Sequence, residues 1–274
     1  MSTCGNWQFV HASVAGVAHL NEGIECQDAC AVRLLERPGS EPILLLVAAD
    51  GAGSAQKARD GAILACATLL EAMTEQLDTV SNHGWYQING RRLLGRIRNV
   101  LGQRATDTGL SINEFACTVL AAALFTDRAL LLQIGDGAIV LGSKGRYRVQ
   151  FWPHNGQYPN ETWFATDSDA MKRLEVAVVF ESVTEIALLT DGLQRLALDY
   201  EHRQGYAPFF RPLFQQLHAC YQHDEDEAPK MLESALAGFL AGAAINQRTR
   251  DDKTLVLAAR AAALKSTTAA TNLR

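Results

Sequence analysis

Four residue pairs that contain aspartate border apolar runs in this chain. Asp50-Gly51, Asp136-Gly137 and Asp191-Gly192 each close such a run, and Asp251-Asp252 stands just before one. A single Asp-Gly pair is an ordinary turn signal. Several aspartates at the ends of buried strands are different, because like charges repel unless a cation neutralises them. The pattern therefore indicates a carboxylate site for divalent cations, which suits metal-assisted hydrolysis.

The run Leu44–Ala49 reads as a short buried strand that presents Asp50 at its mouth. Gly51 and Gly53 allow a sharp turn there, and the Gly51 carbonyl offers a second hard oxygen ligand. Ligands that are all oxygen favour Mg²⁺ or Mn²⁺ over zinc or copper. Two such cations close together can activate a shared water, hold a phosphate and stabilise a leaving oxygen.

The elements that must position these acids are strands on either side of a helical pair. Apolar patterns predict strands within residues 7–20, 26–36, 44–49, 115–125, 129–134, 138–141, 147–151, 186–190 and 254–258. They predict helices after Ser54 and over residues 90–109, 208–220 and 229–244, with a long loop over 152–175. This order favours an α+β fold over an alternating α/β fold.

The first predicted helix has an apolar face made by residues at three- and four-residue spacing. That face contains Ile63, Cys66, Leu70, Met73 and Leu77. Ser54 is placed to cap the N-terminus of this helix.

Composition describes an ordinary folded chain. Its 274 residues suit one large domain or two small ones, and 48% hydrophobic against 20% charged residues permits a substantial core. We interpret 1–274 as one domain, with a core of about 7–262 and a frayed tail over 263–274. A net charge of −5 argues against a nucleic-acid partner. The six cysteines contain no Cys-x-x-Cys pair and read as reduced thiols.

No membrane or export signal is visible in the sequence. The N-terminus lacks a basic segment followed by an apolar one, and the longest apolar runs are too short to span a bilayer. We therefore expect a cytoplasmic protein without membrane contact.

Six short motifs, in order, give the chain a family resemblance. The series is Cys26-Gln27-Asp28-Ala29, Asp50-Gly51-Ala52-Gly53, Ala116-Cys117-Thr118, Ile134-Gly135-Asp136-Gly137, Thr190-Asp191-Gly192-Leu193 and Asp251-Asp252-Lys253-Thr254. It resembles the PPM/PP2C family of metal-dependent Ser/Thr protein phosphatases, over about residues 10–260, and is most similar to a bacterial subgroup. The resemblance implies a four-layer αββα sandwich, in which two antiparallel sheets pack face to face between helices.

The resemblance also implies ligand roles. Asp50 would bridge two metal ions, and the Gly51 carbonyl would bind the second ion. Asp191 and Asp251 would complete the first site. In the family's motif the first acid of the last pair is the ligand, so Asp251 is preferred to Asp252, with a shared role as the alternative.

Two further acids have implied roles. Asp28 would bind the waters of the second metal, and Asp136 together with Asp191 would form a third, weaker site. Two or three Mg²⁺ or Mn²⁺ ions are therefore expected. Asp167 and Asp169, in the loop where the family has a variable flap, read as solvated acids rather than ligands.

The chain departs from the family at the groups that handle phosphate. Many relatives carry a phosphate-gripping arginine where this sequence has Gly23. His19 is a candidate substitute, and Lys57 or Arg59 is a weaker one. His19 can equally be a histidine satisfied within a strand. Some relatives have a histidine after the Asp-Gly pair as leaving-group acid, and Ala52 stands there instead.

These observations give three hypotheses for function. The first is a phosphatase that removes phosphate from serine or threonine of a phosphoprotein, a Ser/Thr kinase or its targets, by in-line attack of a metal-bridging water. The second is a catalytically weakened regulatory or phosphoprotein-binding module on the same fold. The third is a HAD-type phosphohydrolase with an aspartate nucleophile, which fits poorly because residue 52 is alanine rather than an acid.

Overall fold

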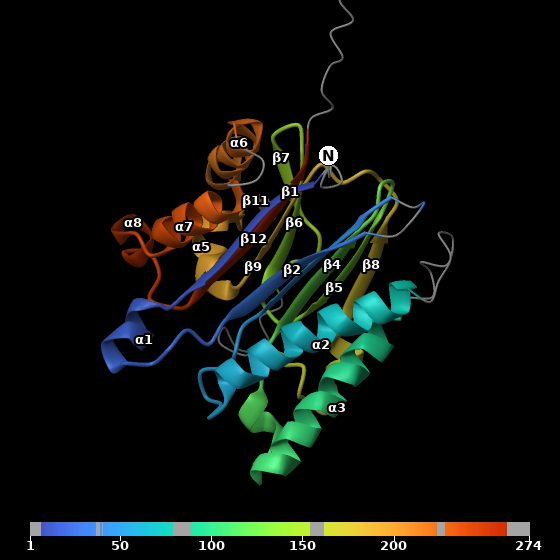
Figure 1. Ribbon diagram of the computed structural model, residues 1–274. Helices are drawn as coiled ribbons and strands as arrows, with labels where there is room; N and C mark the ends of the chain where they lie inside the picture. The colour runs from blue at the N-terminus through green and yellow to red at the C-terminus, as the bar shows by residue number, and fades with distance from the viewer. Residues whose placement is uncertain are drawn as a thin grey trace, which may run out of the picture.

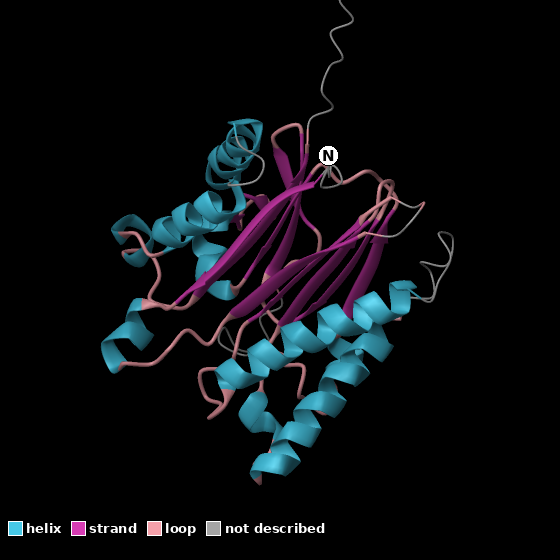
Figure 2. Ribbon diagram, viewed as in Figure 1, coloured by secondary structure: helices cyan, strands magenta, loops and turns pink. Residues whose placement is uncertain are grey.

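Two antiparallel β-sheets pack face to face, and helices cover the outer face of each sheet (Figures 1 and 2). The structure is a computed structural model and describes residues 7–36, 39, 41–78, 89–153, 162–223 and 228–261. Three apolar clusters fill the spaces between the four layers, one between the sheets and one under each helical layer. The predicted αββα sandwich is confirmed.

Each sheet has five strands in the described part of the chain. The first sheet has the order β1 (Trp7–Val14), β12 (Lys253–Arg260), β9 (Glu185–Leu189), β6 (Ala138–Ser143) and β7 (Arg146–Val149). The second has the order β2 (Ala29–Leu35), β3 (Ile43–Ala49), β4 (Val119–Leu124), β5 (Ala129–Ile134) and β8 (Glu175–Val179). A short ribbon pairs β10 (Leu198–Asp199) with β11 (Gln204–Gly205).

The helices divide between the two outer faces. Against the second sheet lie α2 (Ala58–Asp78) and α3 (Gly90–Thr108). Against the first sheet lie α5 (Gln194–Ala197), α6 (Ala207–His223), α7 (Ala228–Leu240) and α8 (Ala243–Asn246). The remaining short helices are α1 (Val17–Glu22), α4 (Ala170–Arg173), η2 (Ile112–Phe115) and η3 (Asp191–Leu193).

Strand β3 is an unbroken apolar run because both of its faces are buried. Successive side chains of a strand point to opposite faces. Leu45 and Val47 therefore pack under the helices, whereas Leu44 and Leu46 pack between the sheets. Both faces are buried, so no position of the strand tolerates a polar residue, and the chain can place one only after the strand ends.

Antiparallel register brings distant chain segments to one rim of the sandwich. In the second sheet, Ala29 at the start of β2 pairs with Ala49 at the end of β3. In the first sheet, Leu189 at the end of β9 pairs with Ala138 and with Leu255, near the starts of β6 and β12. Residues just outside these strand ends therefore gather at the same rim, and those residues include the predicted acids.

Three local predictions were wrong. Residues 17–22 form a helix rather than part of a β opening, and Gly23 ends that helix with φ of 70°. The helix predicted to begin at Ser54 begins at Ala58, and Ile63 on its predicted apolar face is 44% exposed. Residues 175–179, placed at the end of a loop and beyond it, form the edge strand β8.

Some predictions fall partly or wholly outside the described residues. The tail predicted over 263–274 is not described, and the long loop over 152–175 is described only in part. Of the strand predicted over 115–125, Phe115 ends the short helix η2, and residues 116–118 lie between η2 and β4. The five described cysteines are free thiols.

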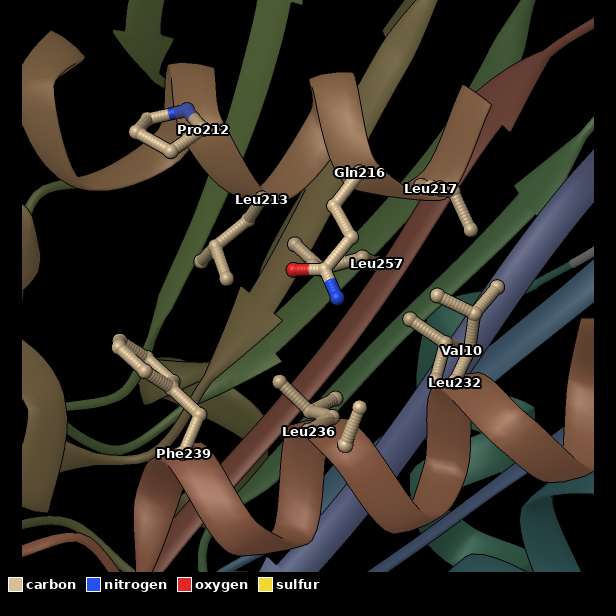
Figure 3. A pocket seen from close by; sticks show the side chains of 10 residues that line it. Val10, Pro212, Leu213, Gln216, Leu217, Leu232, Leu236, Phe239 and Leu257 are labelled. Carbon is tan, nitrogen blue, oxygen red and sulfur yellow. The ribbon is translucent and has the colours of Figure 1, made fainter. Parts of the chain in front are cut away.

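An apolar groove of about 160 Å³ separates α6 from α7 above β12 and β1. In Figure 3, Leu213 of α6 and Phe239 of α7 point toward one another across it, and the amide of Gln216 lies between the two helices. This groove lies over the outer face of the first sheet and contains none of the predicted site residues.

Among the described residues, none of the helices combines the length and the apolar character that a bilayer crossing requires. The expected cytoplasmic location stays a prediction.

The close packing of α2 on η2 generates a test of the fold. A Cβ added to Gly61 would lie 2.3 Å from the Phe115 carbonyl oxygen, whereas at Gly102 of α3 the nearest atom would be 3.8 Å away. Gly61→Ala should therefore lower the free energy of unfolding by about 1–3 kcal/mol. Gly102→Ala should raise it by about 0.5–1 kcal/mol, because alanine favours helices. Urea denaturation measures both, and equal effects would contradict the packing.

Candidate functional site

A cavity of about 180 Å³ opens at the rim where the strand ends converge. We call it the acid cavity. Its lining includes His19, Gln27, Asp50, Gly51, Thr118, Asp136, Asp191, Asp251 and Asp252. Asp28 is buried beside this cavity, because its carboxyl interacts with those of Asp50 and Asp252, which line it. The structure thus brings together all the predicted site residues.

The backbone around Asp50 is fixed by hydrogen bonds that extend the sheet beyond its strands. The Asp50 amide donates to Thr118 Oγ1 at 3.0 Å, and the Thr118 amide donates to the Asp50 carbonyl at 2.8 Å. Gly51 forms an isolated bridge with Cys117. A Cβ on Gly51 would lie 2.6 Å from the Ala58 carbonyl oxygen, so only glycine fits this turn.

Asp28 joins the second sheet to the first. Thr190, which follows β9, donates its hydroxyl to Asp28 Oδ2 at 2.8 Å. The same hydroxyl oxygen accepts the amide of Thr254 at 3.0 Å. Asp28 Oδ1 is buried without a hydrogen-bond partner, as is Gln27 Oε1. A buried carboxylate oxygen without a partner is costly, so this atom is poised to accept a ligand.

The pair Asp251-Asp252 divides into an exposed acid and a buried one. Asp252 is 3% exposed, and its carboxylate accepts the amides of Gly16 and Gln27, each at 2.6 Å. It also contacts His19 Nδ1 at 2.9 Å. Both of its oxygens are therefore occupied by the protein. Asp251 is exposed and lines the acid cavity, which supports the preference for Asp251 as a ligand.

Asp136 lies where the chain passes from β5 in the second sheet to β6 in the first. Its Oδ2 accepts a short hydrogen bond from the Thr162 hydroxyl. Its backbone carbonyl accepts the Gln194 side-chain amide at 2.5 Å. Asp136 is therefore held from two sides, and its carboxyl still lines the acid cavity.

The electrostatics of the rim are dominated by burial and by neighbouring carboxylates. Burial raises the pKa of Asp28 to about 7. Burial, followed by the charges of Asp136 and Asp251, raises the pKa of Asp191 to about 7. Burial, with Asp28 and Asp191 next, holds the pKa of Asp50 well above its usual range. The acids therefore share protons near neutral pH when nothing else compensates their charge.

These residues fit divalent cations by donor chemistry. The donors are carboxylates and a backbone carbonyl, and one buried oxygen of Asp28 lacks a partner. Within the described residues, no three His, Cys, Asp or Glu side chains already have a metal-coordinating arrangement. Instead the Asp50 carboxyl interacts with those of Asp28 and Asp191.

The candidate phosphate-gripping groups are placed differently from one another. His19 lines the acid cavity, with its side chain 19% exposed and Nδ1 against Asp252. His19 lies on α1, so the predicted strand is wrong there, but its Nδ1 is satisfied by Asp252, as the alternative interpretation expected. Arg59 instead pairs with Glu25 at 2.9 Å.

Sequence reasoning missed the supporting roles of Thr190 and Asp252. Thr190 had a visible signal, because it directly precedes an Asp-Gly pair at the end of a strand. Nothing in the sequence shows that Asp252 accepts amides from Gly16 and Gln27, more than 220 positions away.

A sandwich of two antiparallel sheets with carboxylates at one rim is the architecture of a phosphatase of the kind that the motif order resembles. Residues 15–241 match the family described as protein phosphatase 2C. The chain is 35% identical, over 92% of its length and 98% of the relative's, to "Serine/threonine-protein phosphatase 3" of Escherichia coli (strain K12). The chain belongs to the protein phosphatase 2C family.

Solved structures share the fold at low identity. The crystal structure of the serine/threonine phosphatase Stp1 from Staphylococcus aureus has a TM-score of 0.58 at 17% identity, covering 96% of this chain and 97% of that one. PppA of Pseudomonas aeruginosa, described as a key regulatory component of T6SS, has a TM-score of 0.52 at 18% identity, covering 93% and 97%. The predicted family, its bacterial likeness and the predicted enzyme class, a Ser/Thr protein phosphatase, are confirmed, and the HAD-type hypothesis is wrong.

The two acids before β12 should respond oppositely to amide substitution. Asp252→Asn replaces one accepting oxygen with a donor that faces a backbone amide, so it should lower the free energy of unfolding by about 3 kcal/mol. Asp251→Asn should change the free energy of unfolding of the metal-free protein by less than about 0.5 kcal/mol, because Asp251 is exposed. Denaturant titration in EDTA measures both. Equal losses would contradict the division of roles.

Stabilisation by Mn²⁺ should grow with pH. The folded-state pKa of Asp28 and of Asp191 is about 7, above the value of about 3.9 in an unfolded chain. Between about pH 4 and pH 7 the metal-free folded protein therefore keeps protons that the unfolded chain releases. The stability that these bound protons contribute is lost as the pH rises from about 4 through 7. Because Mn²⁺ competes with those protons, its effect on Tm should be larger at about pH 8 than at about pH 5.

Calorimetry at the two pH values measures this difference. Asp127→Asn, which removes an exposed acid distant from the rim, serves as the control and should behave as wild type. The same Mn²⁺-induced rise in Tm at both pH values would show that the rim acids do not exchange protons for metal.

Proposed function

We propose that this chain removes phosphate from phosphoserine and phosphothreonine of proteins, and that the reaction takes place in the acid cavity. One observation carries the proposal. Aspartates from five separate segments line or adjoin one small cavity at the shared rim of two sheets. Such a cluster is unfavourable on its own, so a compensating charge accounts for its presence.

The ligand set follows from which oxygens line the cavity. Asp50, the Gly51 carbonyl, Asp191 and Asp251 would hold two Mg²⁺ or Mn²⁺ ions. Asp251 is preferred because only its Oδ1 accepts an amide, that of Asp252, whereas both oxygens of Asp252 accept amides. Asp136, whose Oδ2 already accepts the Thr162 hydroxyl, suits a third and weaker site shared with Asp191. When bound, the ions lower the pKa of a water and neutralise the phosphate.

Asp28 is a positioning group for water. Thr190 holds one of its oxygens, and the other is buried and unpaired. That free oxygen can accept a hydrogen bond from a water and orient it toward the phosphorus. Water then attacks in line, the P–O bond to the serine or threonine oxygen breaks, and no covalent enzyme intermediate forms.

His19 contributes the imidazole that faces the substrate. Asp252 favours a proton on Nδ1 of His19, which leaves the second ring nitrogen for a group in the cavity. This places an ionisable side chain beside the phosphate in a chain where Ala52 occupies the position of the family's acid. With both ring nitrogens protonated, His19 would donate from that second nitrogen to the phosphate or to the leaving oxygen.

The partners implied are phosphoproteins, among them a Ser/Thr kinase or its targets. The Escherichia coli relative's name refers to serine and threonine, and our proposal applies the same substrate class to this chain. We also propose that the chain acts as one phosphatase domain, since the family match extends across both sheets. The absence of nucleic-acid partners stays a prediction.

Asp50→Asn should abolish the reaction and preserve the fold. The Asp50 carboxyl interacts with those of Asp28 and Asp191. Loss of a group that only supports a metal ligand lowers activity by about 10- to 100-fold. Loss of the proposed ligand Asp50 should therefore lower turnover of p-nitrophenyl phosphate with Mn²⁺ by more than about 100-fold. The Tm in EDTA should not fall, because a neutral amide relieves repulsion at the rim.

Asp127→Asn is the matched control and should keep full turnover. Full activity of the Asp50→Asn protein would reject the proposed centre. Wild-type protein that binds a phosphothreonine peptide but neither binds Mn²⁺ nor turns over would favour the regulatory module instead.

A further inference from the structure

A second, larger cavity adjoins the acid cavity. It measures about 800 Å³, against about 180 Å³ for the acid cavity, and the two share Asp136, Asp191 and Asp251 in their linings. Its lining also includes Arg195, Arg248 and Arg250, none of which lines the acid cavity. We call this cavity the arginine groove. A ligand bound at the three shared acids would therefore have three guanidinium groups in the adjoining cavity.

The three arginines are not used by the protein itself. All three are exposed. In the described part of the chain, no ion pair joins any of them to a carboxylate. The chain carries a net charge of −5, so a wall of three unpaired arginines runs against its overall charge. Such a wall favours an anionic ligand.

The loop that carries two of these arginines has a fixed backbone. Lys253 is fully buried, and its Nζ donates to Asn246 Oδ1 at 2.7 Å, which ties the end of α8 to β12. The Arg250 carbonyl accepts the Ala18 amide at 3.0 Å, and the Arg248 amide donates to the Ile245 carbonyl at 2.8 Å. The arginine side chains thus extend from a held frame.

Arg195 extends from α5, on the other side of the same groove. Its neighbour Gln194 donates to the Asp136 carbonyl at 2.5 Å and accepts the Tyr200 hydroxyl at 2.6 Å. This chain of hydrogen bonds fixes α5 to the acid rim. The backbone that carries Arg195 is therefore held against the acid rim.

We propose that the arginine groove binds carboxylate side chains that flank the phosphorylated residue, so that the enzyme prefers acidic phosphopeptides. The inference rests on the proposed function. A guanidinium group binds a carboxylate through two parallel hydrogen bonds, which gives orientation as well as attraction. The phosphate occupies the acid cavity, and acidic residues a few positions along the peptide reach the arginines.

The test compares two phosphothreonine peptides that differ only in flanking residues, glutamate in one and glutamine in the other. The rate on each is divided by the rate on p-nitrophenyl phosphate. For wild type, kcat/KM should be higher for the glutamate peptide, mainly through a lower KM, and the preference should shrink at high salt. Arg195→Gln and Arg248→Gln should each reduce the preference about three-fold, and the double variant about ten-fold, as exposed ion pairs allow.

Charge reversal and a matched control complete the design. Arg248→Glu should favour a lysine-flanked peptide over the glutamate peptide. Arg104→Gln, which neutralises an exposed arginine on α3, should keep the wild-type preference. Equal wild-type rates on both peptides would overturn the inference and leave the proposed function standing.

Two other outcomes also overturn it. Equal losses on both peptides in the arginine variants would show that these groups grip the phosphate itself and not the flanks. No hydrolysis of either peptide, with Mn²⁺ present, would overturn the proposed function and the inference together.

Discussion

Repulsion between carboxylates at one rim is the constraint on which this structure depends. Burial and mutual charge raise the pKa of Asp50, Asp136 and Asp191, so their placement costs free energy that hydrogen bonds and cores offset. Two hydrogen bonds at the rim cross between the sheets. The Thr190 hydroxyl donates to Asp28, and the Gln27 amide donates to Asp252. Separating the sheets would break them, so the geometry of the rim and the packing of the sheets are coupled.

Much of the fold and most of the rim could be predicted, because their signals are local. Strand β3 is buried on both faces and is apolar throughout, so its first polar residue, Asp50, marks its end. Asp50, Asp136 and Asp191 stand at such ends, after β3, β5 and β9. Their convergence needs the antiparallel register, which the order of the motifs supplied through the family resemblance.

The features that were missed depend on contacts between distant segments. Helix α1 buries none of its residues, and its contacts with distant segments include the Ala18 amide on the Arg250 carbonyl and His19 on Asp252. Edge strand β8 depends on pairing with β5. Asp252 resembles its neighbour in sequence and differs only in which amides meet it in the fold. No pattern confined to one segment contains that information.

Backbone geometry also accounts for the glycine at position 23. Gly23, where relatives carry an arginine, has a φ of 70°, so any other residue there would be strained even though its side chain would meet nothing within 4 Å. Three arginines line the adjoining groove, and one of them, Arg250, directly precedes Asp251 in the chain. One held backbone segment thus carries both a rim acid and a cation. Because a shift of that segment moves both, recognition of the substrate and the geometry of the rim cannot vary independently.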